Sequence, residues 1–193
     1  MELTSNDGVH KLHVVIWQPE ENIRAVMQIS HGMIEFIERY DGFARYLNEQ
    51  GIVVIGNDHL GHGHTAGSDE DLGYFCPDRK SETVVKDLHT VTEYARKEYP
   101  GIPYFLFGHS MGSFMARRYL MTYGNELTGA ILCGTGEQTK IMLLAGKLTA
   151  GVLGTFRGQR YRSEFIRKSS FKGYNDRFKP TRTENDWLTK DTD

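Results

Sequence analysis

Residues 108–112 (Gly-His-Ser-Met-Gly) constrain the fold of this chain more than any other segment. They follow a short apolar run at 103–107, which predicts a buried strand. After Ser110, apolar residues recur at helical spacing as far as Tyr123, which predicts a helix. The serine is therefore expected at a sharp turn between a strand and a helix, where a side chain on either flanking glycine would collide across the turn.

A serine at such a turn is typical of hydrolases in which the serine hydroxyl is the nucleophile. We therefore take Ser110 as the candidate nucleophile and expect its backbone to be strained. The following helix would present free N–H groups at its first turn, where they favour negative charge. The alternative is an ordinary glycine-rich turn between a strand and a helix.

An oxyanion hole in such a protein needs a second backbone donor, which comes from the loop after an earlier strand. Residues 25–30 predict that strand, and they run directly into residues 31–33 (His-Gly-Met). Because the glycine lets the backbone approach closely, we expect the N–H groups of Met33 and Met111 to be the two donors. One such donor is typically worth about 3–4 kcal/mol of the barrier. Without the serine turn, a plain loop would be the simpler interpretation.

Strand and helix patterns alternate along the first two thirds of the chain. Such alternation predicts an α/β protein with a mostly parallel sheet and helices on both faces. Ligands then bind beyond the carboxyl ends of the strands, where Ser110, His31 and Asp58 all fall. The expected strands cover 9–18, 24–30, 52–56, 103–107 and 128–133, and the expected helices cover 37–50, 81–98 and the segment from the serine to 123.

Three motifs in this order resemble those of one enzyme family. Residues 30–40 (Ser-His-Gly-Met-Ile-Glu-Phe-Ile-Glu-Arg-Tyr) resemble the HGxxEhxxRY stretch of the monoglyceride lipase and lysophospholipase branch of the α/β-hydrolases. Residues 57–64 (Asn-Asp-His-Leu-Gly-His-Gly-His) resemble the D-H-x-G-H-G loop of that branch, and residues 108–112 resemble its G-H-S-M-G turn. The resemblance covers residues 25 to about 135.

The resemblance implies an α/β-hydrolase fold and a serine hydrolase that cleaves carboxylic esters. It implies that Ser110 is the nucleophile, that Met33 and Met111 supply the oxyanion hole, and that no cofactor or metal is needed. The implied substrate is a monoacylglycerol, a lysophospholipid or a similar single-chain lipid. An aminopeptidase-like amide hydrolase is the alternative activity, although residues 31–35 lack the glycine- and proline-rich loop that those relatives favour.

Three further side chains match family positions near the site. Glu35 and Arg39 have the spacing of an ordinary i,i+4 ion pair on a helix, and we favour that structural interpretation. His109 resembles the histidine that shapes the turn in the family, and it is not the base.

The histidine that would activate the serine is missing from this sequence. In this architecture the triad runs serine, acid, histidine, whereas all eight histidines lie at or before His109. We favour the explanation that the acid, the base and the last strands of the sheet lie outside these residues. Residues 1–136 would then be the N-terminal part of the core, 137–193 the start of a helical lid, and the chain alone inactive. A non-catalytic binding relative and an unusual base are the alternatives.

The last third of the chain changes in character. Residues 141–153 are apolar almost all round, which favours a lid helix over an acyl pocket or in transient contact with a membrane surface. A buried core helix fits the pattern equally well. Residues 157–182 hold six Arg and three Lys against two carboxylates, a net charge of +7. We expect a solvated helical face over a packed aromatic side, with attraction of anionic head groups as the alternative.

Composition and the remaining motifs limit the partners, the cellular setting and the metal sites that we expect. A net charge of −2 and the absence of a nucleic-acid motif exclude a nucleic-acid partner, and the start of the chain resembles no signal peptide. Two cysteines make a disulfide improbable and favour a reducing, cytoplasmic setting; Cys133 is expected in the core and Cys76 in a loop. The loop with His59, His62 and His64 lacks a matching Cys or carboxylate pair, so we predict no metal. The oligomeric state is open.

Overall fold

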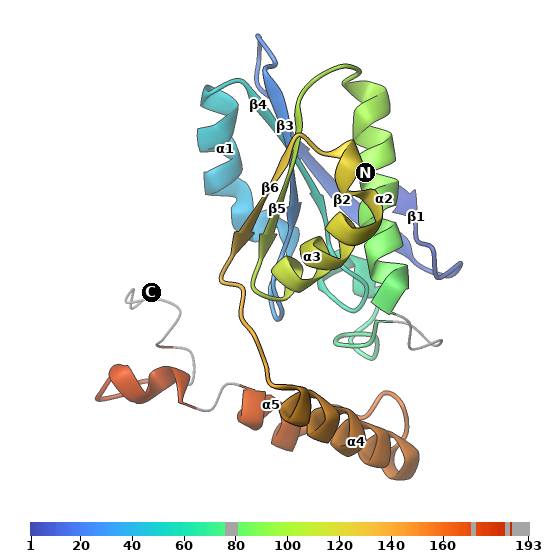
Figure 1. The fold of residues 1–193 in the computed structure, drawn as a ribbon, viewed down its shortest axis with the longest axis vertical. Helices are drawn as coiled ribbons and strands as arrows, with labels where there is room; N and C mark the ends of the chain where they lie inside the picture. Colours follow the sequence, from blue (N-terminus) through green and yellow to red (C-terminus); the bar gives the residue numbers. More distant parts are fainter. Residues whose placement is uncertain (76–80, 171–172, 184–185, 187–193) are drawn as a thin grey trace. The chain divides into compact units, whose positions relative to one another are not determined.

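One sheet organises residues 1–137 in this computed structural model (Figure 1). Its six strands lie in the order β1-β2-β4-β3-β5-β6. The two outermost pairings on the N-terminal side are antiparallel, and all the others are parallel. The strands are β1 (Glu2–Thr4), β2 (Lys11–Trp17), β3 (Ala25–Ser30), β4 (Ile52–Asn57), β5 (Tyr104–His109) and β6 (Gly129–Cys133).

The structure describes residues 1–75, 81–170, 173–183 and 186. These residues divide into two compact units, Met1–Glu137 and Gln138–Asp193. Cys76, which we expected in a loop, lies outside the described residues.

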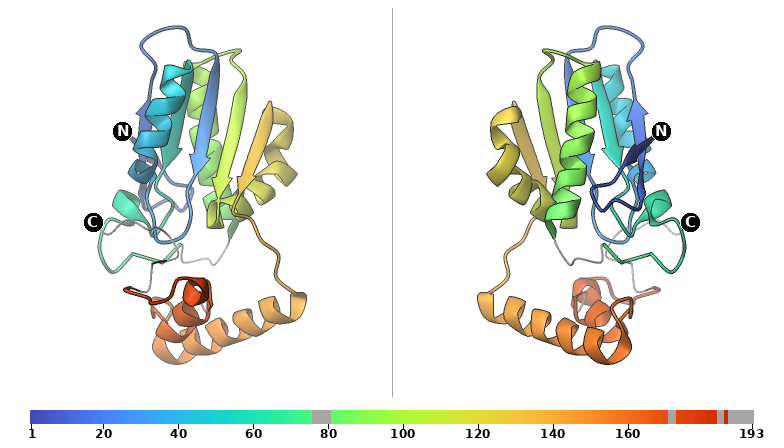
Figure 2. Two further views of the ribbon diagram at one scale, coloured as in Figure 1. Left: turned by 90° about the vertical axis from the view of Figure 1, so that its left-hand side faces the viewer. Right: turned by 90° about the vertical axis from the view of Figure 1, so that its right-hand side faces the viewer.

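Helices cover both faces of the sheet, as the alternating pattern predicted (Figure 2). One face packs Met27, Ile29 and Val54 against Ala44 and Leu47 of α1. The opposite face packs sheet residues against α2 and α3. The helices of this unit are η1 (Ile37–Tyr40), α1 (Asp41–Glu49), η2 (Gly63–Ala66), α2 (Ser81–Glu98), α3 (Met111–Tyr123) and η3 (Gly124–Glu126).

The element boundaries agree with the sequence to within a few residues, with two differences. The helix expected over 37–50 is divided into the short helix η1 and the helix α1, and Gly51 follows with φ +74°. The strand β1 was not predicted, because its three residues are too few to show a periodicity.

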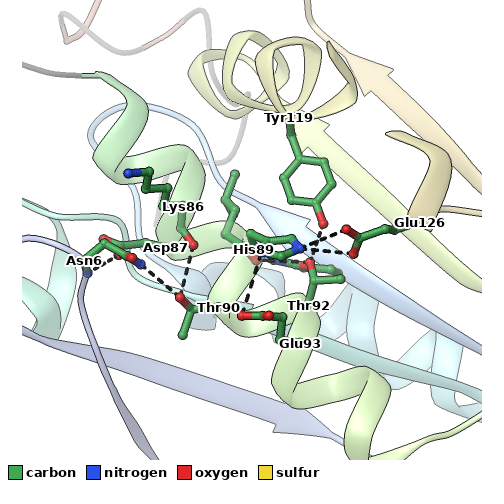
Figure 3. Close-up of polar contacts among 11 residues, drawn as sticks. Asn6, Lys86, Asp87, His89, Thr90, Thr92, Glu93, Tyr119 and Glu126 are labelled. Atoms are coloured by element: carbon green, nitrogen blue, oxygen red, sulfur yellow. Dashed lines mark hydrogen bonds and ion pairs between the residues drawn. The ribbon is translucent and has the colours of Figure 1, made fainter. Parts of the chain in front are cut away.

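A buried polar network fastens α2 and α3 to the sheet (Figure 3). The Thr92 hydroxyl donates to Gln28 Oε1 at 2.6 Å and accepts from the Tyr119 hydroxyl at 2.9 Å. Tyr104 donates to the same Gln28 oxygen at 2.7 Å. Since each of these groups is paired, their burial carries little penalty and holds α2 in one position on the sheet.

Asp87, in the first half of α2, ties this helix to the N-terminal segment. Its buried carboxylate accepts from the Ser5 hydroxyl at 2.8 Å. It also accepts from the side chain of Asn6 at 2.9 Å (Figure 3). The segment before β2 is therefore tied to the helix by side-chain hydrogen bonds between residues more than eighty positions apart.

The second unit contains only helices among its described residues: α4 (Lys140–Arg157), α5 (Glu164–Ser170) and η4 (Tyr174–Arg177). The Thr139 hydroxyl caps α4 by accepting from the Met142 N–H at 3.3 Å. No residue of α4 is buried, so the buried core helix that fitted the pattern is not found. Within the described residues, no helix has the length and apolar content needed to cross a membrane.

Two expectations about burial are wrong. Four of the aromatic side chains among the basic residues, Phe156, Tyr161, Phe165 and Tyr174, are exposed and not packed away. Phe178 is half-buried, and Phe171 lies outside the described residues. Cys133 is a free, exposed cysteine and not a core residue. It ends β6, which pairs only with β5 among the described residues.

Candidate active site

Ser110 occupies the sharp turn that the sequence predicted. It lies between β5 and α3 with φ +49° and ψ −117°, a conformation that is costly for a residue with a side chain. Its N–H donates to the Cys133 carbonyl at 2.9 Å, and its carbonyl accepts from the Ser113 hydroxyl at 2.6 Å. These bonds on both sides hold the strained backbone in place and leave the serine half-buried at the carboxyl end of β5.

The glycines on either side of the serine are required by close backbone contacts. A Cβ on Gly108 would lie 2.6 Å from the Gly112 carbonyl oxygen. A Cβ on Gly112 would overlap the Ser30 carbonyl at the end of β3. The collision across the turn is therefore confirmed, and the start of α3 also packs directly against the neighbouring strand.

The loop after β3 runs beside the serine. A Cβ on Gly32 would lie 3.2 Å from the Ser110 Cβ, so these two backbones are neighbours. Met111 is the first residue of α3, where a helical N–H has no partner within its own helix. In the described residues, no acceptor for the Met33 N–H is found either. The two amides expected as oxyanion donors thus belong to adjoining segments, and their role stays a prediction.

His31 orients the peptide that carries one of these amides. It is buried, its Nδ1–H donates to the Gly32 carbonyl at 2.7 Å, and its Nε2 accepts from the His59 N–H at 3.0 Å. Burial lowers the pKa of His31 to about 4, so the ring stays neutral and can accept. Because C=O and N–H point in opposite directions across a trans peptide, fixing the Gly32 carbonyl also fixes the direction of the Met33 N–H.

Ile34 continues the loop in an unusual conformation. Its φ is +59°, which is rare for a β-branched residue, and its side chain is exposed. Nothing in the residue pattern indicated this strain. It is found one residue after Met33, in the loop that borders the serine.

The carboxylate of Glu35 joins this loop to the serine turn. Its Oε1 accepts from the Gly32 N–H, from the Tyr40 hydroxyl at 2.9 Å and from His109 Nδ1 at 3.1 Å. Burial raises the pKa of Glu35, but the hydrogen bonds from His109, Gly32 and Tyr40 outweigh it and hold the pKa below its usual value. The side chain is therefore an anion beside His109.

The expected ion pair between Glu35 and Arg39 is present, with Arg39 Nη1 at 3.2 Å from Oε2. Glu35, however, precedes η1 and does not lie on a helix, and most of its contacts go to the two loops of the site. The structural interpretation was therefore incomplete. Sequence spacing could not have revealed the contact with His109, because the two residues are 74 positions apart.

Asp58 holds the loop after β4 against the loop after β3. Its carboxylate accepts from the Ile37 N–H at 2.8 Å and from the His64 N–H at 2.7 Å. Burial raises the pKa of Asp58, while these two backbone bonds oppose that effect. Gly63 passes so close, at φ +46°, that any side chain there would overlap the carboxylate.

The histidines of the loop after β4 belong to two different groups. His59 and His62 are buried and pack against His31 with tilted rings, whose centres lie 4.2 Å (His59) and 5.3 Å (His62) from that of His31. Burial lowers the pKa of both His59 and His62. His64 is exposed and lies beside His13 of β2, with the rings 4.7 Å apart. The loop is thus a support for the site and does not bring its own three histidines to one point.

No histidine is positioned to activate the serine within the described residues. The Ser110 hydroxyl forms no hydrogen bond there with any histidine, and His109 turns to Glu35 instead. Among the described downstream carboxylates, Glu126 contacts His89 and Asp186 contacts Thr183, so neither forms a serine–histidine–acid arrangement. The unusual base considered from the sequence is therefore not found in this part of the chain.

Two hollows of about 700 and 640 Å³ lie at the amino ends of the parallel strands, whereas the serine lies at their carboxyl ends. The larger is lined by the segments that precede β3 and β4, and the smaller by those that precede β5 and β6. Since ligands of open α/β sheets bind at the carboxyl ends of the strands, these hollows are not part of the candidate site.

Known proteins resemble this chain in both sequence and fold. The family described as serine aminopeptidase, S33, matches residues 21–193. Monoglyceride lipase of Rattus norvegicus is 31% identical over 157 residues, which cover 78% of this chain and 50% of that protein. Monoacylglycerol lipase of Mycolicibacterium smegmatis is 30% identical over 129 residues, which cover 66% of this chain and 44% of that protein.

Among solved structures, a thermostable carboxyl esterase from Bacillus coagulans in complex with glycerol matches 97% of this chain and 60% of its own length. The TM-score is 0.86 and the sequence identity 31%. The chain spans about half the length of the curated relatives that it matches.

Proposed function

The chain belongs to the serine aminopeptidase, S33, family and has the α/β-hydrolase fold, and from this we propose that the protein is a serine hydrolase of carboxylic esters. The observation that carries the proposal is the strained Ser110 at the carboxyl end of β5, with the Gly32 loop packed against it. A nucleophilic serine must be held in one position, and a strained turn with another backbone packed closely against it does this.

In the proposed reaction, the Ser110 hydroxyl attacks the ester carbonyl carbon. Its proton passes to a histidine and from there to the leaving alcohol as the C–O bond breaks. The N–H groups of Met33 and Met111 stabilise the oxyanion, and each is worth about 3–4 kcal/mol of the barrier. Water then hydrolyses the acyl-enzyme, and the serine is restored.

We assign the histidine and its acid to residues outside these 193. In support, none of the described histidines bonds to the Ser110 hydroxyl, and the relatives are about twice as long as the matched region. Without a base the hydroxyl stays protonated and is a poor nucleophile. The 193 residues alone should therefore be inactive.

The proposed substrate is a monoacylglycerol or a similar single-chain lipid ester. This rests on the relatives that are 30% identical or more, which are named monoglyceride lipase and monoacylglycerol lipase. An amide hydrolase is the second candidate, because the family is described as a serine aminopeptidase. The proposed role of residues 137–193 is a lid for the acyl chain, for which the exposed apolar residues of α4 are the support.

A fluorophosphonate probe tests for an activated serine. The full-length gene product should be labelled, and S110A should not be. S169A should be labelled like the wild type, since Ser169 is exposed and its hydroxyl donates to the Phe165 carbonyl. A full-length protein that contains a downstream acid and histidine but resists the probe would contradict the proposal and favour a non-catalytic binding protein.

The substrate class needs a separate measurement. Hydrolysis rates of monoacylglycerols with short and long acyl chains should exceed those of aminoacyl anilides by a wide margin. Faster cleavage of the anilides would favour the amide hydrolase instead.

A further inference from the structure

Three side chains with metal-binding groups meet on the sheet unit, and none of them is a residue expected to take part in catalysis. They are His13 of β2, Glu38 of η1 and His64 of η2, and one ligand atom from each lies within 4.8 Å of the other two. Within the residues that the structure describes, this is the only cluster of three or more such groups. The cluster brings together three elements that are separate in the sequence.

The polar atoms of this cluster are incompletely paired. His13 Nε2 lies 2.6 Å from Glu38 Oε1. The other carboxylate oxygen, Glu38 Oε2, is buried and has no hydrogen-bond partner in the described part of the chain. A buried carboxylate oxygen without a partner is costly, and such an atom is a reason to look for an unassigned ligand.

The backbone around the cluster is already fixed. The Asp58 carboxylate accepts from the N–H of His64 and from the N–H of Ile37, the neighbour of Glu38. The His13 N–H donates to the Thr65 hydroxyl at 2.8 Å, next to His64 in the chain. His13 and His64 are thus held by their own backbone N–H groups, and Glu38 follows a residue that is held in the same way. The site would therefore need little reorganisation to bind an ion.

We propose that His13, Glu38 and His64 form a binding site for a divalent cation of the zinc type. Two imidazoles and one carboxylate are a zinc ligand set, and water would complete the tetrahedron. The ion would bind the lone pair of the neutral His13 Nε2 in place of the hydrogen bond to Glu38, with the single ring proton of His13 carried on Nδ1. Ligand atoms around tetrahedral zinc lie about 3.3 Å apart, so small side-chain rotations bring these three into place.

Zinc titration of the full-length, tag-free protein by calorimetry tests the site. One Zn²⁺ should bind, and cobalt(II) should give the visible absorption of a tetrahedral complex. H64Q should weaken zinc binding by more than about 100-fold, because loss of outer-shell partners alone costs 10–100-fold. Zinc should also raise the Tm of the wild type but not that of H64Q.

The matched control is H10Q. His10 also lies against a carboxylate, with Nδ1 at 2.5 Å from Asp7 Oδ2, but no third ligand joins that pair within the described residues. H10Q should bind zinc like the wild type. E38Q should lose zinc binding as H64Q does. If E38Q fails to fold, H64Q still tests the site, because the His64 side chain is exposed and the bond to Asp58 is made by the backbone N–H of His64, which the substitution keeps.

Absence of saturable zinc binding in the wild type would overturn the proposal, and so would equal binding by the wild type and H64Q. Neither result bears on Ser110, which the probe experiment tests in metal-free protein.

Discussion

Single residues at the serine turn combine several contacts, and this makes the site sensitive to small changes. Gly108 and Gly112 leave no room for a methyl group, and Glu35 connects three donors from different segments. Substitutions at Gly112 and Glu35 test the two kinds of contact separately.

Gly112→Ala should be severely destabilising. Its Cβ would overlap the Ser30 carbonyl, so either α3 or β3 must move, and overpacking of this kind costs about 1–3 kcal/mol or more. Gly42→Ala is the matched control, since Gly42 lies in α1 and a Cβ there would meet nothing within 4 Å. That change should leave the free energy of unfolding unchanged or raise it by up to about 1 kcal/mol. Urea unfolding measures the free energy of unfolding of both variants. Equal values for the two would contradict the packing argument.

Glu35→Gln should lower the labelling rate of Ser110 in the full-length protein and destabilise the fold by about 1–3 kcal/mol. The amide keeps one acceptor oxygen but loses the charge that His109 and Arg39 face. Arg39→Ala should cost less than about 1 kcal/mol, because Arg39 is about half exposed and exposed ion pairs contribute little. If Arg39→Ala reproduced the whole effect, the ion pair would matter more than the hydrogen bonds to the loop and the turn.

At the scale of elements, α2 is held by polar groups as well as by apolar packing. The pairs Thr92–Gln28 and Thr92–Tyr119 link the helix to β3 and α3 (Figure 3). Burial raises the pKa of Tyr119 to about 12, so its hydroxyl remains a donor in this network at neutral pH.

Thr92→Val should destabilise the protein by about 1–3 kcal/mol, because the Tyr119 hydroxyl would lose its acceptor while remaining buried. Thr90→Val lies on the same helix but removes only contacts at the surface, so its cost should be well below about 1 kcal/mol. Thermal or urea unfolding compares the two. Equal costs would mean that the network adds no more than helix propensity.

For the whole molecule, buried neutral histidines make stability depend on pH. The pKa of His31 is about 4 in the folded state and about 6.5 in an unfolded chain. Below pH 6.5 the unfolded state therefore binds a proton that the folded state refuses, so stability falls as the pH drops from about 6.5 to 4. His31 alone would account for about 3 kcal/mol of that loss.

His31→Gln should be less stable than the wild type at neutral pH and should lose less stability between about pH 6.5 and 4. Denaturant unfolding at a series of pH values measures the slope. H10Q serves as the comparison, since His10 lies outside this buried cluster. An unchanged slope in His31→Gln would show that other groups cause the acid sensitivity.

The sequence by itself determined the features that depend on residues close to one another along the chain. Periodicity and glycine placement predicted the strands, the helices, the strained serine and the loop beside it, because local sterics decide these. The proposed roles of Ser110, Met33 and Met111, and the lid over 137–193, were also read from the sequence and stay predictions.

Only the tertiary structure decided which distant residues meet and in which order the strands lie. The contact of Glu35 with His109 and the meeting of His13, Glu38 and His64 depend on how strands and loops pair across the chain. Among the described residues, the exposure of Cys133 likewise depends on the strand order, because β6 pairs there only with β5. No pattern within a short window contains such information, because strand order and the packing of separate loops are properties of the folded chain.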